Sequence, residues 1–193
     1  MSKTKTLIYC SLFTALIAAG AFIKIPVPVV PFTLQYLFTG LLLGSKRGTI
    51  SVVAYMLLGL AGLPIFSEGG GLWYVFKPSF GYIIGFCLGT YVTGRIAEHL
   101  KKKTIFCYLL ANLAGLMIVY ACGMIYYYVI CNYVIDTPIG IWPLILYCFL
   151  LAVPGDIALS ILGAIIARRV RPVVIQYLSD SNTTLLHTEE TAK

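Results

Sequence analysis

Leu150-Leu-Ala-Val-Pro-Gly-Asp-Ile-Ala-Leu-Ser160 places Asp156 in the middle of the last long apolar run of the chain, between Trp142 and Arg168. A carboxylate at the centre of a membrane helix costs about 2.5 to 3.5 kcal/mol on insertion scales. Such a side chain is tolerated where it faces a cavity, a partner helix or a ligand. Asp156 is therefore the first candidate for a functional residue.

The composition around this stretch is typical of an integral membrane protein. The 193 residues are 60% hydrophobic and 11% charged, whereas soluble domains carry about 25% charged residues. Because one spanning helix takes about 20 residues, this length predicts six helices joined by short loops. We expect one six-helix membrane domain at residues 1–178, followed by a polar, disordered cytoplasmic tail at 179–193.

Six apolar runs give the expected spans, at about 6–23, 32–44, 49–62, 80–96, 104–133 and 141–167. Three prolines between Pro26 and Pro31 separate the first two spans, since proline interrupts helices. The residues from Ser45 to Gly48 are expected to turn the chain between the next two. The N-terminal run has some features of a cleaved signal peptide, but it is long for one, so we expect a retained helix.

Basic residues gather on one side of these spans. Of the 14 lysines and arginines, all but Lys24 and Lys77 fall on the side of the two termini. Because basic loops stay in the cytoplasm, both termini are predicted to be cytoplasmic and the number of spans to be even. The net charge of +7 therefore indicates membrane orientation and not nucleic-acid binding.

Two spans carry small residues at every fourth position, a spacing that lets a second helix approach closely. These are Ser11, Ala15 and Ala19 in the first span, and Gly81, Gly85 and Gly89 in the fourth. Both faces are expected to be packing faces.

The face of the last helix that carries Asp156 also carries Ser160 and several small residues, so it is expected to point into the bundle. Pro154 removes a backbone donor, and Gly155 loosens the helix just before the aspartate. The carbonyl groups freed in this way are expected to line a cavity.

Two interpretations of Asp156 stay open from the residues alone. It binds a ligand in that cavity, or it makes an interhelical hydrogen bond to Gln35, Thr33 or a tyrosine. Gln35 and Thr33 themselves either hold helices together or line the site. Lys77 is either a cation at the headgroup level or a residue of the pocket mouth that attracts an anion.

Several kinds of site are not supported by the sequence. It contains no G-x-x-x-x-G-K-[ST] phosphate loop, no histidine cluster and no Ser/His/Asp set, and its six cysteines are scattered singly. We therefore expect no metal site, no disulfide framework, no cofactor and no enzymatic turnover. Secondary transporters usually have broken helices in both halves, whereas here only the last span combines a charge with Pro-Gly, which favours a small binding subunit.

Five stretches, in this order and spacing, resemble the biotin-specific substrate-binding subunits (S components) of energy-coupling factor (ECF) vitamin transporters, from about Ala15 to Arg171. The stretches are Ile25-Pro-Val-Pro-Val-Val-Pro-Phe-Thr-Leu-Gln35, Leu42-Leu-Gly-Ser-Lys-Arg-Gly48, Tyr55-Met-Leu-Leu-Gly-Leu-Ala-Gly-Leu-Pro-Ile-Phe66, Lys77-Pro-Ser-Phe-Gly-Tyr-Ile-Ile-Gly-Phe86 and Pro154-Gly-Asp156. Each alone is a weak signal, but together they are highly specific.

The resemblance implies an all-α integral membrane protein with the six-helix bundle of an ECF S component, N-in and C-in, in the cytoplasmic membrane of a prokaryote. It would bind biotin on the extracellular side and act with a transmembrane coupling subunit and two ATPase subunits. In the family, the aspartate that matches Asp156 binds the ureido group, and the segment between the first two helices is a lid. The small-residue ridge of the first helix docks on the coupling subunit, which here implies Ser11, Ala15 and Ala19.

The chemistry agrees with this resemblance. A carboxylate accepts hydrogen bonds from the two N–H groups of a ureido ring. Aromatic walls suit the apolar part of biotin, and its carboxylate would sit near Lys77 and Lys24. The expected substrate-binding residues are Asp156, Lys77, Ser79, Tyr82, Gln35, Thr33, Phe66, Phe86 and Ser160.

The sequence departs from the family pattern at two places. Members often carry a lysine one turn beyond the aspartate, where this chain has Leu159 and Ser160, and a threonine at the position of Ser79. We expect Lys77 to replace the missing lysine as the partner of the ligand carboxylate. The alternatives are an S component for another vitamin or small molecule, a membrane-embedded enzyme, and a purely structural packing partner.

Overall fold

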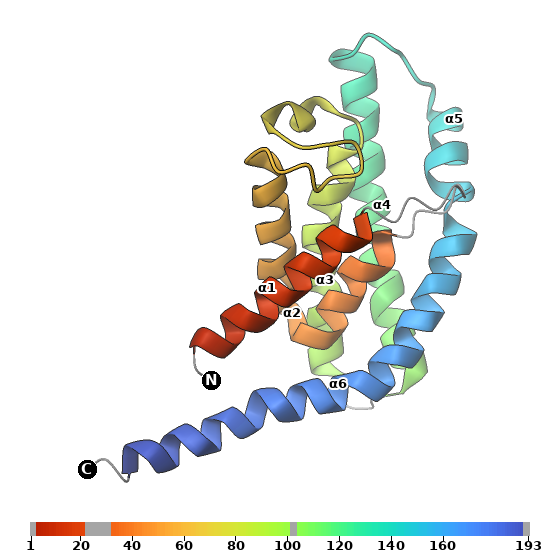
Figure 1. Cartoon of the computed structure of the whole chain (residues 1–193). Helices are drawn as coiled ribbons and strands as arrows, with labels where there is room; N and C mark the ends of the chain where they lie inside the picture. The colour runs from red at the N-terminus through yellow and green to blue at the C-terminus, as the bar shows by residue number, and fades with distance from the viewer. Residues whose placement is uncertain (1–2, 22–31, 101–103, 191–193) are drawn as a thin grey trace.

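The expected apolar runs form a bundle of helices in a computed structural model of the chain (Figure 1). The structure describes the backbone of residues 3–21, 32–100 and 104–190, and side chains at 6–21, 36–100, 104–174 and 176. Within these ranges the only β pairing is an isolated bridge between Phe66 and Gly69. The helices are α1 (Lys3–Ala21), α2 (Phe32–Leu60), the 3-10 helix η1 (Leu72–Phe76), α3 (Phe80–His99), α4 (Ile105–Tyr133), α5 (Ile141–Ile145), the π-helix η2 (Leu146–Leu150) and α6 (Val153–Glu190).

Three helical stretches in the described ranges are long and apolar enough to cross a membrane, namely 36–60, 105–133 and 141–174, and a shorter apolar helix covers Thr6–Ala21. The first of the three is not one straight helix. It changes direction at Gly44, which has φ 81° and ψ −179°. After that residue the chain folds back, so that a Cβ at Gly48 would lie 3.1 Å from the Cα of Gly40.

The expected turn from Ser45 to Gly48 is wrong, because these residues are helical and the chain reverses at Gly44 alone. A positive φ of this size favours glycine, which has no Cβ to clash with its own carbonyl. Glu98 of α3 then caps the helix that follows. Its carboxylate accepts hydrogen bonds from the Ser45 backbone N–H at 2.7 Å and from the Ser45 hydroxyl at 2.8 Å. A carboxylate at a helix N-terminus is also favoured by the helix dipole.

Replacing Glu98 by alanine is expected to lower the thermal stability of the detergent-solubilised protein. The lost cap corresponds to about 1 kcal/mol, or about 2 to 4 °C in Tm for a chain of this size. Ser45→Ala removes only one of the two hydrogen bonds and should cost less. If the decrease in Tm of the double variant equals the sum of the two single decreases, the two side chains do not interact.

The glycine ridge of α3 packs directly against α4, as the spacing predicted. A Cβ at Gly85 would lie 3.0 Å from the backbone of Val119, and a Cβ at Gly89 would lie 2.9 Å from the carbonyl oxygen of Gly115. Real Cβ contacts are longer than this. The two backbones can therefore approach this closely only because the α3 positions have no side chain.

The other small-residue ridge lies on the outside of the bundle. Ser11, Ala15 and Ala19 of α1 are exposed, whereas the opposite face of α1 packs on α2. One contact on that inner face is the hydrogen bond from the buried Thr14 hydroxyl to the carbonyl oxygen of Ser51, at 3.0 Å. The ridge therefore remains available to a partner.

The last span is interrupted above Asp156. We expected one helix over 141–167, but α5 passes into the π-helix η2, residues 151 and 152 form a turn, and α6 begins at Val153. Pro154 consequently lies in the first turn of α6, where its missing N–H is not needed. The interruption thus lies before Pro154, at residues 146–152.

At its other end α6 is held to the bundle by Arg171, which is buried. The Arg171 guanidinium donates a 2.8 Å hydrogen bond to the carbonyl oxygen of Ala97, near the C-terminus of α3, and lies 5.3 Å from the ring centre of Tyr108. Beyond it, α6 contains Pro172 and continues as helix to Glu190, past residue 178 where we expected the membrane domain to end. Figure 1 shows this last part projecting from the bundle.

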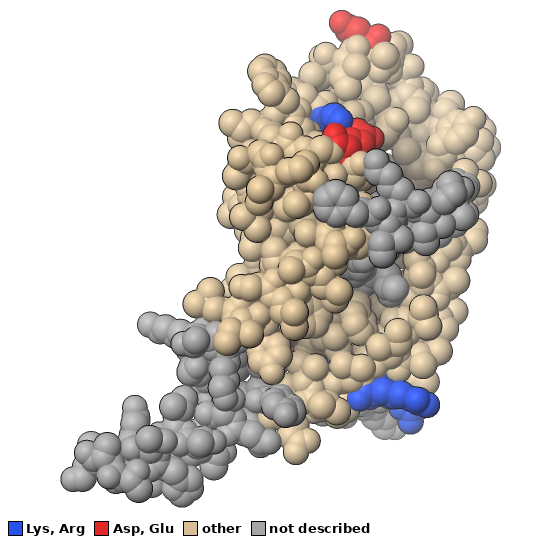
Figure 2. All heavy atoms as spheres, viewed as in Figure 1, with Lys and Arg blue, Asp and Glu red and all other residues tan. Residues whose placement is uncertain are grey.

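Charged residues gather at the two ends of the bundle, and the described residues of the flank between them that Figure 2 shows in tan carry no charge. The lower end holds the Gly44 turn, the C-terminus of α3 and Arg171, which the contacts of Glu98 and Ala97 bring together. The upper end holds the connection between α2 and α3, where Lys77 pairs with Glu68.

Candidate functional site

A cavity of about 300 Å³ lies inside the upper half of the bundle, between the helices and the connection that joins α2 to α3. This volume is at the lower end of the range for small-molecule sites, about 300 to 1,000 Å³. Every helix from α1 to α6 except the short α5 contributes to its wall. The lining residues are Ala21, Tyr36, Tyr55, Phe66, Ser67, Tyr74, Ser79, Tyr82, Ile83, Phe86, Val119, Tyr120, Tyr147, Cys148 and Asp156.

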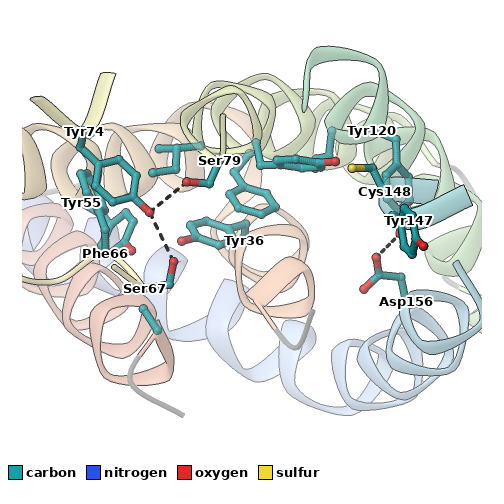
Figure 3. Close-up of a pocket in the computed structure, with 15 residues that line it drawn as sticks. Tyr36, Tyr55, Phe66, Ser67, Tyr74, Ser79, Tyr120, Tyr147, Cys148 and Asp156 are labelled. Carbon is teal, nitrogen blue, oxygen red and sulfur yellow. Dashed lines mark hydrogen bonds between the residues drawn. The ribbon is translucent and has the colours of Figure 1, made fainter. Parts of the chain in front are cut away.

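Asp156 occupies one end of this cavity and is 2% exposed. It stands in the first turn of α6, and its backbone N–H donates to the carbonyl of Ala152 at 3.1 Å. The hydroxyl of Tyr120 on α4 donates a short hydrogen bond to its Oδ2 atom. Tyr147 and Cys148 of η2 complete this end of the cavity (Figure 3). The expected tyrosine partner and the expected cavity are therefore both present.

The middle of the cavity is aromatic and aliphatic. The rings of Tyr36 and Phe86 are stacked, with centres 3.9 Å apart and planes 5° from parallel. Tyr55 meets Tyr36 edge-on at 5.8 Å. Together with Ile83 and Val119, these rings form an apolar part of the cavity wall that suits the apolar part of a ligand.

The end opposite Asp156 is formed by three hydroxyl groups from the connection between α2 and α3. The Tyr74 hydroxyl lies 3.3 Å from the Ser67 hydroxyl and accepts a hydrogen bond of 3.3 Å from the Ser79 hydroxyl. In Figure 3 these groups lie on one side of the view and Asp156 on the other, with Tyr36 between them. The cavity thus has a polar group at each end and an apolar middle.

The connection is fixed to the helices by its own backbone. The Tyr55 hydroxyl donates to the carbonyl of Ile65 at 2.9 Å, and the Gly71 N–H donates to the carbonyl of Gly59 at 2.7 Å. Tyr126 of α4 donates to the carbonyl of Val75. These bonds place Phe66, which is 3% exposed, in the cavity wall.

Lys77 does not line the cavity. Its ammonium group pairs with the Glu68 carboxylate at 2.9 Å and lies 5.2 Å from the ring centre of Tyr74. Its side chain is 41% exposed. Lys77 is therefore close to the hydroxyl end of the cavity but separated from it by the Tyr74 ring.

The structure brings together five of the nine expected substrate-binding residues, namely Asp156, Ser79, Tyr82, Phe66 and Phe86. Ser160 is buried but outside the cavity wall, and its backbone carbonyl accepts a 3.3 Å hydrogen bond from Asn112. The side chains of Thr33 and Gln35 lie outside the described residues, as do Lys24 and the proline segment expected to form a lid.

Sequence reasoning missed most of the aromatic wall, including Tyr36, Tyr55 and Tyr120. A tyrosine deep in an apolar run needs a partner for its hydroxyl group, and this requirement was the available signal for Tyr120. The positions of Tyr147 and Cys148 at the cavity could not be read from the sequence, because the helix phase that turns them to the cavity depends on η2.

Comparison with known proteins gives the family. Residues 1–176 match the family model described as the BioY family. The chain belongs to the BioY family. The resemblance found in the sequence is thereby confirmed.

Curated members of the BioY family are similar over nearly the whole chain. A probable biotin transporter BioY from Lysinibacillus sphaericus is 40% identical over 174 residues, which is 89% of each chain. The biotin transporter BioY of Thermotoga maritima is 38% identical over 180 residues, 89% of this chain and 99% of that protein.

A solved structure has the same fold. The crystal structure of the S component for biotin from an ECF-type ABC transporter superimposes with a TM-score of 0.74 at 31% identity, covering 89% of this chain and 95% of the other. The all-helical bundle described above is therefore the fold of an ECF S component.

Proposed function

We propose that this protein is the substrate-binding subunit of an ECF-type biotin transporter and that it binds biotin in the cavity closed by Asp156. The observation that carries the proposal is a buried carboxylate at one end of a mostly aromatic cavity of about 300 Å³. The family membership supports biotin as the ligand, since the relatives are named as biotin transporters.

The ureido ring of biotin is proposed to lie at the Asp156 end. The carboxylate offers two acceptor oxygens, and a ureido ring offers two N–H donors, so the pairing is charge-assisted and favoured in a site without water. Tyr120 holds the carboxylate in place through its hydroxyl. The thiophane ring and the valeryl chain then lie between Tyr82, Phe86 and Phe66. Thr33 and Gln35 remain proposed contacts of the ligand, whereas Ser160 lies outside the cavity wall and is not proposed as a contact.

The membrane arrangement is proposed to be six spans with both termini in the cytoplasm of a prokaryotic cell. The two halves of α2 on either side of Gly44 would count as separate spans, with α1, α3, α4 and the α5–α6 unit as the other four. The gathering of Lys46, Arg47, Arg95 and Arg171 at the lower end supports this orientation, because basic loops stay inside. The biotin cavity would then open to the outer side.

The exposed ridge of Ser11, Ala15 and Ala19 on α1 is proposed as the docking face for the transmembrane coupling subunit. Small residues on an outward face let a partner helix approach closely. Two ATPase subunits would supply the energy for transport, since the sequence has no phosphate loop of its own.

Calorimetric titration of the detergent-solubilised protein with biotin tests the proposal. We expect saturable binding of biotin and none of a vitamin without a ureido ring, such as thiamine or riboflavin. Mass spectrometry of the purified protein provides a second measurement, as biotin retained through purification should be released on unfolding. Binding of another vitamin in place of biotin would instead identify an S component of different specificity.

A further inference from the structure

The hydroxyl end of the cavity has not yet been assigned to a particular group of the ligand. Ser67, Tyr74 and Ser79 all line the cavity, and Tyr74 is 3% exposed. They come from one connection, whose backbone is tied to α2 and α4 by the bonds of Tyr55 and Tyr126. Their positions relative to the cavity are therefore set by the fold.

The hydrogen bonds within this group are weak. Both distances to the Tyr74 hydroxyl are 3.3 Å, whereas O–H···O bonds are usually about 2.7 to 2.8 Å long. A hydroxyl proton also rotates freely about its C–O bond, so each group can donate in more than one direction. These hydroxyls can therefore turn their protons toward a ligand without losing a strong bond to each other.

The two ends of the cavity have opposite hydrogen-bonding character. Asp156 presents acceptor oxygens, whereas the hydroxyl group presents donors. A ligand that matches both ends carries N–H donors at one end, an apolar middle and an oxyanion at the other end. The position of Lys77 favours the same orientation, because its positive charge lies 5.2 Å from the Tyr74 ring centre, on the side of the hydroxyl end.

We propose that Ser67, Tyr74 and Ser79 form the subsite for the carboxylate of the ligand, and that Lys77 acts on that carboxylate only through Tyr74. The inference rests on the proposed function, with the ureido ring at Asp156. In this arrangement the valerate carboxylate accepts hydrogen bonds from neutral O–H groups. They take the place of the lysine that family members often carry one turn beyond the aspartate, and that α6 lacks here. Lys77 then has an indirect role, because its ammonium group is paired with Glu68 at 2.9 Å outside the cavity.

The test compares biotin with biotinamide, its neutral primary amide, by calorimetric titration. The wild-type protein is expected to prefer biotin. In a Ser67→Ala/Ser79→Ala variant the affinity for biotin should fall by about tenfold or more, since donors to a charged group are lost. The affinity for biotinamide should fall much less, so the preference for biotin shrinks. Tyr74→Phe should act in the same direction.

Two matched variants separate a subsite from a structural role. Ser79→Thr keeps the hydroxyl and should keep the preference for biotin, and Lys77→Gln should change the preference by less than about threefold, because a partly exposed cation is screened by solvent. The binding data for a variant are compared with the wild type only if the variant has the same Tm as the wild-type protein. Equal losses for biotin and biotinamide in the serine variants would overturn the subsite, as would a lost preference in Lys77→Gln alone.

The outcome for the wild-type protein distinguishes this inference from the proposed function. If wild-type protein binds neither biotin nor biotinamide, the proposed function fails and the subsite fails with it. If wild-type protein binds both ligands with the same affinity, biotin binding stands and the carboxylate subsite alone is overturned.

Discussion

Asp156→Ala abolishes biotin binding, while the protein stays folded and monodisperse in detergent. The variant removes two charge-assisted hydrogen bonds to the ureido ring, each corresponding to about 1.5 to 3 kcal/mol, so the loss in affinity is roughly 10² to 10⁴-fold. Folding should survive because the aspartate lies in the first turn of α6 and lines a cavity, where its removal creates no new clash. Calorimetry and gel filtration on both proteins measure the two effects.

Graded variants make this result more specific. Tyr120→Phe removes the hydroxyl that holds Asp156 Oδ2 but leaves the carboxylate, so it should weaken biotin binding by about tenfold. Asp156→Asn removes the charge but keeps the side-chain shape and should also weaken biotin binding. Its matched control is Asp136→Asn, because Asp136 is exposed and has a φ of 55° that asparagine also accepts. Unchanged affinity in Asp156→Ala would exclude the aspartate from the site.

The second large effect is expected from Gly85→Leu, which separates α3 from α4. A Cβ at Gly85 already lies 3.0 Å from the backbone of Val119, so a leucine side chain has no space unless one helix moves. Overpacking of this kind costs about 3 kcal/mol or more when backbone has to shift. Val119 also lines the cavity, so its displacement should abolish biotin binding together with stability.

Thermal unfolding and biotin titration measure the effect of Gly85→Leu. Gly85→Ala should give an intermediate result, because a single methyl group requires a shift of only a few tenths of an ångström. Leu88→Phe on the same helix adds volume at a position that is 50% exposed and should leave both Tm and affinity unchanged. A wild-type Tm for Gly85→Leu would show that α3 and α4 do not pack as described.

Much of this fold was readable from composition and spacing, and the exceptions have physical causes. Apolar runs and the Gly81–Gly89 spacing predict where helices lie and which of them touch. We expected the turn at Ser45–Gly48, whereas the chain reverses one residue earlier, at Gly44. The sequence did not show this, because the cap of the following helix comes from Glu98, a residue distant in sequence. Pro154 and Gly155 predicted a loosened helix near Asp156, but the π-helix at Leu146–Leu150 was not predicted, because residues 146–152 include neither proline nor glycine.

The site was predictable where a residue is unusual for its surroundings and not where it is ordinary. Asp156 is costly in an apolar run, so it was found at once. Tyr36 and Tyr55 need partners for their hydroxyl groups, but a tyrosine in a packed core has the same need, so the sequence does not show which tyrosines face a cavity. Lys77 was expected to touch the ligand because it is one of two outer cations and could replace the missing lysine, but its pairing with Glu68 depends on the fold of the connection.

The π-helix above Asp156 sets the angular phase of the last span. In an uninterrupted α-helix each residue advances by about 100°, so Tyr147 and Asp156, nine positions apart, would point in roughly opposite directions. Both nevertheless line the same cavity, because η2 and the turn at residues 151 and 152 rotate the outer part of the span relative to α6. The ligand-facing residues of this span therefore lie on two helical segments that differ in rotation about the axis, and the residues between them set the angle at which Tyr147 and Asp156 meet across the cavity.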